Sequence, residues 1–439
     1  MIKAGQPSLH QAIGRLALIG LVLNAVIGSS VFGLPSVIGA RLGPASPGAW
    51  LVAAAGMVLV VACFAEVASR FGQAGGPYLY ARVAFGRVAG IEMAWLTYLV
   101  RLTAAATNAN LFVIYLAEFQ PAVTGPLHTP VILALMLLPL AIANYRGVGS
   151  GLKVNNAFIV AKLVPLAVFV IVGSTLLLGA SAPPASSPRV AADLGVWLEV
   201  ILLLVFAYGG FEAALVPLAE AKNPRRDAPV ALFTMLGTCA LLYTLVQAIV
   251  IAALPDPGAS SRPLADAAGV FLGSWGATMM AVGALLSMYG YLAGAMLNVP
   301  RLTYAMAEQG DLPVRFGAVH PRFRTPHVSV VVFAVLVWAL AAGGSFLQNL
   351  TLSAVSRLFT YGAVCAALVL LRRRERRTPA LVSPAWFRVP AGSVVAFLGL
   401  AFSAALALRM NQREILVLGA TMALGLLHWA WMARRHPAR

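Results

Sequence analysis

The chain has 439 residues, of which 60% are hydrophobic and only 10% are charged, and its mean hydropathy is +0.87. These proportions exclude an ordinary soluble enzyme and indicate a membrane protein that crosses the bilayer many times. The formal net charge of +17 would suggest nucleic acid if it were clustered, but most basic residues lie in segments between apolar runs. No nucleic-acid partner is therefore expected.

The apolar runs define the predicted architecture. A transmembrane helix needs about 20 residues. The polar first fifteen residues lead directly into the first run, so we expect no cleaved signal peptide. The very short loop near 346–350 makes the division between the ninth and tenth runs the least distinct. We predict an all-α polytopic membrane protein with about 12 transmembrane helices, at 16–39, 48–69, 89–118, 129–145, 154–178, 194–218, 228–254, 268–298, 328–346, 351–371, 391–408 and 414–433.

The first run is broken in its middle. Its sequence LIGLVLNAVIGSSVFGLP places Gly28, Ser29 and Ser30 where the hydrocarbon is driest. An unwound turn at this depth leaves backbone N–H and C=O groups that only protein, water or a ligand can satisfy. The break therefore indicates a binding site, unless the small residues form a face for close helix packing.

Three basic residues lie inside predicted runs. At the rise of an α-helix, Arg101 lies about 18 Å into the third run and Lys162 about 12 Å into the fifth. Charged side chains at such depths face the protein interior or a cavity. Arg101 would pair with a carboxylate such as Glu212 or line a pocket, and we favour pairing. Arg357, in the tenth run, would likewise either pair with a carboxylate or line a pocket.

The sixth run is broken as well. FAYGGFEAALVPLAE at 206–220 contains Gly209 and Gly210, with Pro217 before its charged end. Interrupted segments at corresponding positions of two halves point to a transporter site at the bilayer midplane, so the second break favours binding over packing. Glu212 follows this break, where it would either cap the inner half-helix or take up a proton.

The loops indicate the orientation. With both termini on one side, the segments on that side hold 23 basic residues and those on the other side hold 5. By the positive-inside rule the richer side is cytoplasmic. The run RRRERR at 372–377 is thus a signal of topology, and the segment at 179–193, rich in Pro, Ser and Ala, indicates a linker.

The cysteines and histidines predict neither a metal site nor a disulfide. Cys63, Cys239 and Cys365 occur in separate apolar runs without paired spacing. The sequence contains no His-Glu-x-x-His pair, which disfavours an intramembrane enzyme. We expect no cofactor and no metal.

Five motifs in chain order resemble the amino acid–polyamine–organocation (APC) superfamily of amino acid permeases. They are IGSSVFGLP (27–35), AGGPYLYARVAFG (74–86), AKLVP (161–165), FAYGGFEAALVPLAEAKNPRRDAP (206–229) and PRLTYAMAEQGDLP (300–313). The resemblance implies two inverted five-helix repeats with discontinuous helices 1 and 6, followed by two extra helices. Residues 1–178 would hold the N-terminal segment and first repeat, 179–371 the second repeat, and 372–439 the basic loop and helices 11 and 12.

The resemblance also implies an amino acid site between the two breaks. The α-carboxylate would meet N–H groups at the positive end of the outer half of helix 1, and the α-ammonium would meet carbonyls at the negative end of the outer half of helix 6. Helix 8 would touch the substrate side chain. The implied substrate-binding residues are Ile27, Gly28, Ser29, Ser30, Val31, Phe206, Ala207, Gly209, Tyr291 and Ala295.

Two of these positions and Lys162 carry specific expectations. Ser30 stands where many relatives have glycine, which narrows the approach or adds a hydroxyl donor. Phe206 matches the aromatic residue that covers the substrate in relatives, unless it is an ordinary packing residue. Lys162 matches a helix 5 lysine that in some members stands where sodium-coupled relatives hold Na⁺. With Glu212 it is a candidate for proton coupling, the alternative being a fixed charge that braces helices 1 and 8.

The expected function is secondary active transport of amino acids across the cytoplasmic membrane by alternating access, coupled to protons and independent of sodium. An exchanger, or a nutrient sensor on the same fold that does not transport, is the alternative. The expected partners are an amino acid, protons and the lipid bilayer, and the oligomeric state is left open.

Overall fold

The computed structural model describes residues 14–73, 75–147, 152–178, 193–308, 310–378 and 383–435. The predicted linker at 179–193 lies outside these residues except for Asp193. Within the described residues the chain is helical and contains no β-strand. The α-helices are α1 (Arg15–Val26), α2 (Ser29–Leu42), α3 (Ser46–Ala68), α4 (Gly76–Phe85), α5 (Arg87–Leu116), α6 (His128–Arg146), α7 (Leu152–Leu178), α8 (Leu194–Tyr208), α9 (Phe211–Ala214), α10 (Pro224–Ala253), α11 (Pro263–Glu308), α12 (His327–Ala342), α13 (Phe346–Arg377), α14 (Gly392–Ala407) and α15 (Gln412–Arg435).

Short 3-10 helices complete the connections between these helices. They are η1 (Gly43–Ala45), η2 (Pro121–Thr124), η3 (Val216–Glu220), η4 (Pro257–Ala259) and η5 (Val314–Gly317).

The predicted spans correspond to these helices in order. The first span is divided into α1 and α2, and the sixth into α8 and α9. Nine segments of the described chain are long and apolar enough to cross a membrane, one of them joining α2 to α3, and α1, α12 and α14 are shorter apolar helices. The fold is therefore that of an all-helical polytopic membrane protein, as the sequence predicted.

The turn between α12 and α13 is short because Ser345 caps the N-terminus of α13 only three residues after the end of α12. The Ser345 hydroxyl accepts a hydrogen bond from the Gln348 N–H at 3.3 Å, and the Gln348 side chain accepts one from the Ser345 N–H at 3.1 Å. This reciprocal cap satisfies two N–H groups that a helix start otherwise leaves unpaired. The ninth and tenth spans are thus separate, as predicted, but the predicted place of the loop was wrong: the turn lies at 343–345, and residues 346–350 belong to α13.

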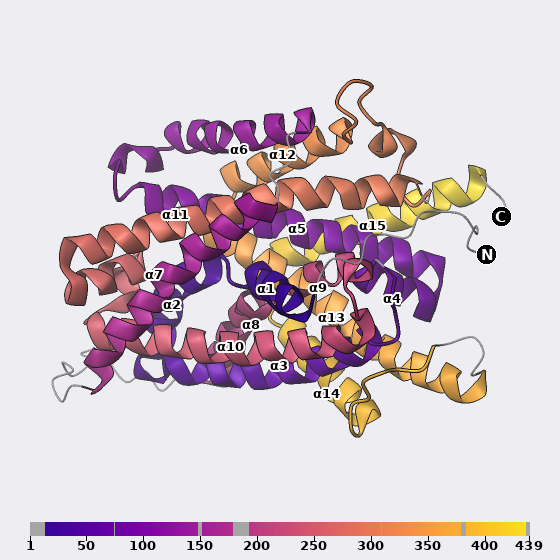
Figure 1. Ribbon diagram of the computed structural model, residues 1–439, viewed down its shortest axis with the longest axis horizontal. Helices are drawn as coiled ribbons and strands as arrows, with labels where there is room; N and C mark the ends of the chain where they lie inside the picture. Colours follow the sequence, from indigo (N-terminus) through magenta and orange to yellow (C-terminus); the bar gives the residue numbers. More distant parts are fainter. Residues whose placement is uncertain are drawn as a thin grey trace.

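The broken helices lie in the middle of the bundle. Figure 1 shows α1, α8 and α9 near the centre, with α3 and α10 running together on one side and α5 and α11 on the other. α1 packs against α9, and α2 packs against α8. The two breaks are therefore held next to each other and away from lipid, where their free backbone groups can face protein or a ligand.

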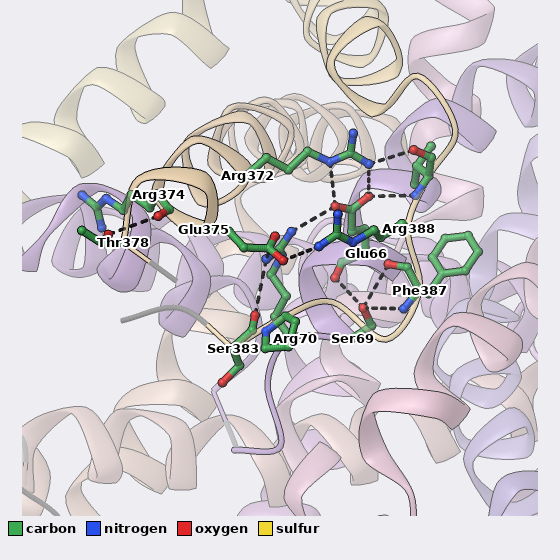
Figure 2. Close-up of polar contacts among 12 residues, drawn as sticks. Glu66, Ser69, Arg70, Arg372, Arg374, Glu375, Thr378, Ser383, Phe387 and Arg388 are labelled. Carbon is green, nitrogen blue, oxygen red and sulfur yellow. Dashed lines mark hydrogen bonds and ion pairs between the residues drawn. The ribbon is translucent and has the colours of Figure 1, made fainter. Parts of the chain in front are cut away.

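One end of the bundle carries most of its ion pairs, and we call it the basic end. Figure 2 shows Glu66 and Glu375 between three guanidinium groups. Glu66 accepts hydrogen bonds from Arg372 Nε at 2.7 Å, from Arg70 Nη2 at 3.2 Å and from the Val389 N–H at 2.8 Å. Contacts here join the ends of α3 and α13, the segment 383–391 and the start of α10. Arginines that make hydrogen bonds or ion pairs at the basic end include Arg70, Arg82, Arg87, Arg225, Arg372 and Arg388, and the exposed end of α13 up to Arg377 lies there too.

Candidate functional site

The first break separates α1 from α2 by two residues. Ile27 is extended, with φ −73° and ψ 96°, and Gly28 has φ −130° and ψ −142°, so neither continues the helix. α2 then begins at Ser29, where the first N–H groups of a helix have no partner within it. Ser29 and Ser30 are each only 1% exposed, so these donors lie inside the protein.

The second break depends on a glycine with positive φ. Gly210 has φ +114°, and a Cβ at this position would lie 2.3 Å from the carbonyl oxygen of Ala25. Only glycine permits both that backbone conformation and that close approach. The second break is thus pressed against the end of α1, which brings the two discontinuities together.

A small cavity lies where the breaks meet. Its volume is about 10 Å³, room for about one water molecule. Residues from α1, α2, α5, α8, α11 and α13 and from both breaks surround it: Ala25, Val26, Gly28, Ser29, Ser30, Ala104, Asn108, Phe206, Gly209, Tyr291 and Arg357.

Polar atoms without partners converge on this cavity. Ser29 Oγ, Asn108 Oδ1, and Nε and Nη1 of Arg357 are buried and have no hydrogen-bond partner among the described residues. The Asn108 amide nitrogen is occupied, because it donates to the Ala104 carbonyl at 2.8 Å. Buried polar groups are normally paired, so several unpaired ones around a single space indicate a polar ligand.

Arg357 and Glu212 form an ion pair beside the second break. Nη1 of Arg357 lies 3.3 Å from Oε1 of Glu212, and each side chain is less than 5% exposed. The other carboxylate oxygen, Oε2, accepts a hydrogen bond from the Gly210 N–H at 2.9 Å. The guanidinium carbon of Arg357 is 5.4 Å from the ring centre of Phe206. Glu212 therefore makes the capping contact considered from the sequence and also carries the salt bridge.

Arg101 does not make the salt bridge that the sequence favoured. Glu212 takes Arg357 as its direct partner, and Arg101 acts on the same carboxylate only through space. Arg101 is 9% exposed and makes no salt bridge within the described part of the chain. Its place is one turn before Ala104 on the cavity side of α5.

Lys162 is attached to the first break. Its ammonium donates hydrogen bonds to the carbonyl oxygens of Ile27 at 2.7 Å and Asn24 at 2.9 Å. The carbonyl of Asn24 would bond to Gly28 in a continuous helix, so the break frees it for the lysine. The contact with helix 1 is therefore direct, and Lys162 reaches it from α7, which also packs against α11.

The structure brings most of the predicted substrate-binding residues to the cavity. Six of them line it: Gly28, Ser29, Ser30, Phe206, Gly209 and Tyr291. The other four lie outside the lining: Ile27, Val31, Ala207 and Ala295. Ala295 instead packs beside the hydrophobic cluster of α5, α6 and α12.

Asn108 is the polar lining residue that sequence reasoning missed, along with the apolar Ala25, Val26 and Ala104. It lies seven residues after Arg101 and four after Ala104, which places all three on one face of α5. A polar residue on the same helical face as a deep arginine was the signal that could have found it.

Comparisons with known proteins agree with this fold and site. The family model described as amino acid permease matches residues 13–420. The chain is 27% identical over 410 residues to the methylthioribose transporter of Bacillus subtilis, which covers 88% of this chain and 86% of that protein. It is 23% identical over 457 residues to the branched-chain amino acid permease BcaP of the same organism, with 99% and 95% covered.

A eukaryotic relative covers most of this chain but less of its own length. Cationic amino acid transporter 4 of Mus musculus is 28% identical over 405 residues, which is 86% of this chain and 63% of that protein. Because the family match extends over most of the chain and includes both helix breaks, the protein belongs to the amino acid permease family of the APC superfamily.

Proposed function

We propose that this protein is a secondary active transporter of amino acids in the cytoplasmic membrane, with both termini in the cytoplasm, coupled to protons and independent of sodium. The observation that carries the proposal is the set of unpartnered polar atoms around the cavity between the two breaks. A transporter must strip water from a charged solute and replace it with protein groups. Such groups stay unpaired until the solute arrives.

The backbone of an amino acid fits the polarity of the cavity. Its carboxylate would lie at the N-terminus of α2, where the hydroxyl of Ser29 and free N–H groups offer donors. Its ammonium would meet Oδ1 of Asn108 and the negative C-terminal end of α8 near Phe206. Dipoles and amide groups hold such a zwitterion without a strong counter-ion, so release remains feasible.

The size of the cavity supports alternating access. Room for about one water molecule is too small for an amino acid, so the surrounding helices must move apart for the substrate to enter. The short segments next to the breaks, α1 and α9, are packed against each other and are suited to move together.

The relatives support transport as the class of function. Their printed names give different solutes, namely methylthioribose, branched-chain amino acids and cationic amino acids. For this chain the amino acid class rests on the family and on the zwitterion fit.

The environment of Lys162 supports proton coupling. The ammonium donates hydrogen bonds to the carbonyl oxygens of Asn24 and Ile27 at the first break. Loss of its charge would weaken these hydrogen bonds and so its contact with α1. A sodium site needs several oxygen ligands. In the stretch from Gly283 to Pro300 the only hydroxyl-bearing Ser or Thr is Ser287, so α11 offers few ligands for such an ion.

Purified protein in proteoliposomes tests the proposal. A thermal-shift screen of the twenty amino acids would identify a ligand, because binding to the folded state raises the melting temperature. Uptake of that labelled ligand should follow an imposed proton gradient and persist when choline replaces sodium. Uptake that requires sodium would contradict the assignment. Uptake driven only by internal amino acid would favour the exchanger, and binding without uptake the sensor.

A further inference from the structure

The charges buried around the cavity do not balance. Arg101 and Arg357 contribute two positive charges and Lys162 a third when it is protonated, whereas Glu212 contributes one negative charge. All four side chains are at most 9% exposed. Charged groups inside a membrane protein are expensive unless they pair, so an excess of buried cations calls for an anion.

An amino acid with a neutral side chain would not supply that anion. Its carboxylate and its ammonium cancel, and the excess positive charge remains. A lysine or arginine substrate would increase it. A substrate with a second carboxylate is the one that reduces the imbalance.

Arg357 is placed to receive such a carboxylate. Its guanidinium lies against the second break, since a Cβ on Gly209 would be only 1.8 Å from Nη1. Nη1 faces Glu212 but lacks a well-directed hydrogen bond, and Nε has no acceptor at all within the described chain. The side chain is 3% exposed and lines the cavity, so a ligand in the cavity lies next to it.

Arg101 adds a second positive charge near the cavity. It acts on Glu212 through space, and it lies one turn from Ala104, which lines the cavity. Because Glu212 already pairs with Arg357, the charge of Arg101 has no direct counter-ion. The field at the cavity is therefore positive.

We propose that the substrate is an acidic amino acid, whose side-chain carboxylate binds the guanidinium of Arg357, and that cationic amino acids are rejected by this site. The inference rests on the proposed function and adds the substrate class to it. A planar guanidinium presents several N–H donors, so Arg357 can keep its ion pair with Glu212 and still offer its unpartnered Nε–H to a substrate carboxylate. The same group repels a substrate ammonium or guanidinium at the end of the side chain.

The first test uses the unaltered protein. Melting temperatures are measured with glutamate, aspartate, glutamine, leucine and lysine at neutral pH. Glutamate or aspartate should bind roughly tenfold to a hundredfold more tightly than glutamine, the difference expected for hydrogen bonds to a charged group, and lysine should not bind. Equal or tighter binding of glutamine, leucine or lysine would overturn the inference while leaving amino acid transport intact. If no amino acid binds, the proposed function fails as well.

The second test removes the receiving charge. Arg357→Gln together with Glu212→Gln deletes both members of the buried pair, so neither is left unpaired. This variant should lose the preference for glutamate over glutamine. The control is Arg409→Gln with Glu199→Gln, a salt bridge outside the cavity whose side chains are 35% and 44% exposed, and it should keep the preference. If Arg357→Gln with Glu212→Gln still prefers glutamate to glutamine, Arg357 does not bind the side-chain carboxylate of the substrate. If that variant does not fold, the comparison of ligands on the unaltered protein decides alone.

Discussion

At the scale of single residues, a side chain at Gly209 should disturb the site by displacing Arg357. A methyl group there would fall 1.8 Å from Nη1 of Arg357, so the guanidinium would have to leave the second break. We expect Gly209→Ala to weaken amino acid binding by at least about tenfold, the loss of one hydrogen bond to a charged group. Isothermal calorimetry with the ligand found by thermal shift measures this.

Gly294 on α11 provides the matched control for that substitution. A Cβ at Gly294 meets no atom within 4 Å, so Gly294→Ala should bind normally. Equal affinity in both variants would return the second break to a role in helix packing. Replacement of Ser30 by Leu or of Gly209 by Val should abolish binding for the same steric reason.

Lys162 should be the residue on which pH-driven transport depends. Lys162→Ala removes the two hydrogen bonds to the carbonyls of Asn24 and Ile27. We expect uptake under an imposed proton gradient to fall to its value without a gradient, while amino acid binding remains. Lys222→Ala, at an exposed position, should leave uptake unchanged. If Lys162→Ala loses binding and pH response together, the lysine is a structural brace.

At the scale of elements, Glu66 joins α3 to α13 at the basic end. Its carboxylate accepts hydrogen bonds from Arg70, Arg372 and the backbone of Val389 (Figure 2). Glu66→Gln would leave Arg372 without its ion pair and the buried Arg70 with Glu375 as its remaining counter-ion. We expect the free energy of unfolding to fall by about 3–5 kcal/mol, as when one partner of a buried pair is removed.

Thermal unfolding in detergent checks the role of Glu66. The exposed Glu308 serves for comparison, and Glu308→Gln should change the melting temperature little. Equal shifts in the two variants would mean that the contacts of Glu66 add no stability beyond those of a surface carboxylate.

The short helix α4 is joined to the segment after α11 through Tyr78 and Asp311. The Tyr78 hydroxyl donates a hydrogen bond to the fully buried carboxylate of Asp311. The same carboxylate accepts hydrogen bonds from Arg82 at 2.9 Å and from Arg87 at 3.3 Å. Burial is the main cause that raises the pKa of Tyr78 to about 12, and the hydrogen bond to Asp311 raises it further, although Arg82 opposes the change.

The raised pKa predicts a loss of stability at high pH. The folded state holds the phenol proton more tightly than the unfolded chain, whose tyrosine has the ordinary pKa of 10.0. The contribution is therefore complete below pH 10.0 and is lost as the pH rises to about 12. Tyr78→Phe should be less stable below pH 10.0, and its stability should decline less between these values. Parallel curves for the two proteins would contradict this.

At the scale of the whole molecule, the charge asymmetry predicts which end faces the cytoplasm. All three native cysteines are buried, so an introduced surface cysteine would be labelled selectively. Arg377→Cys at the basic end should react only with reagents that reach the cytoplasm, and Ala259→Cys in η4 only with impermeant reagents added outside. Both positions are exposed. The reverse pattern would invert the topology, and labelling of both from one side would rule out the twelve-span arrangement.

Local sequence predicted the spans, their order and both breaks, because each follows from short-range properties. A run of apolar residues predicts a spanning helix, and clusters of small residues at 28–30 and 209–210 mark where such a helix can be interrupted. The capped start of α13 at Ser345 is equally local, since the cap is formed by residues three apart. The presence of Arg101, Lys162 and Arg357 inside spans could likewise be predicted, because it depends only on their positions within apolar runs.

The partners of those charges were decided by the tertiary structure. Arg101 and Arg357 offered the same chemistry to Glu212, and only the packing of α13 beside α8 gives the salt bridge to Arg357. The place of Asn108 in the site likewise depends on how α5 is rotated toward the first break. The sequence by itself determined the twelve-span class, the breaks and the basic end. The tertiary structure decided which polar atoms face the cavity without a partner, because pairing across helices depends on distances that no local pattern encodes.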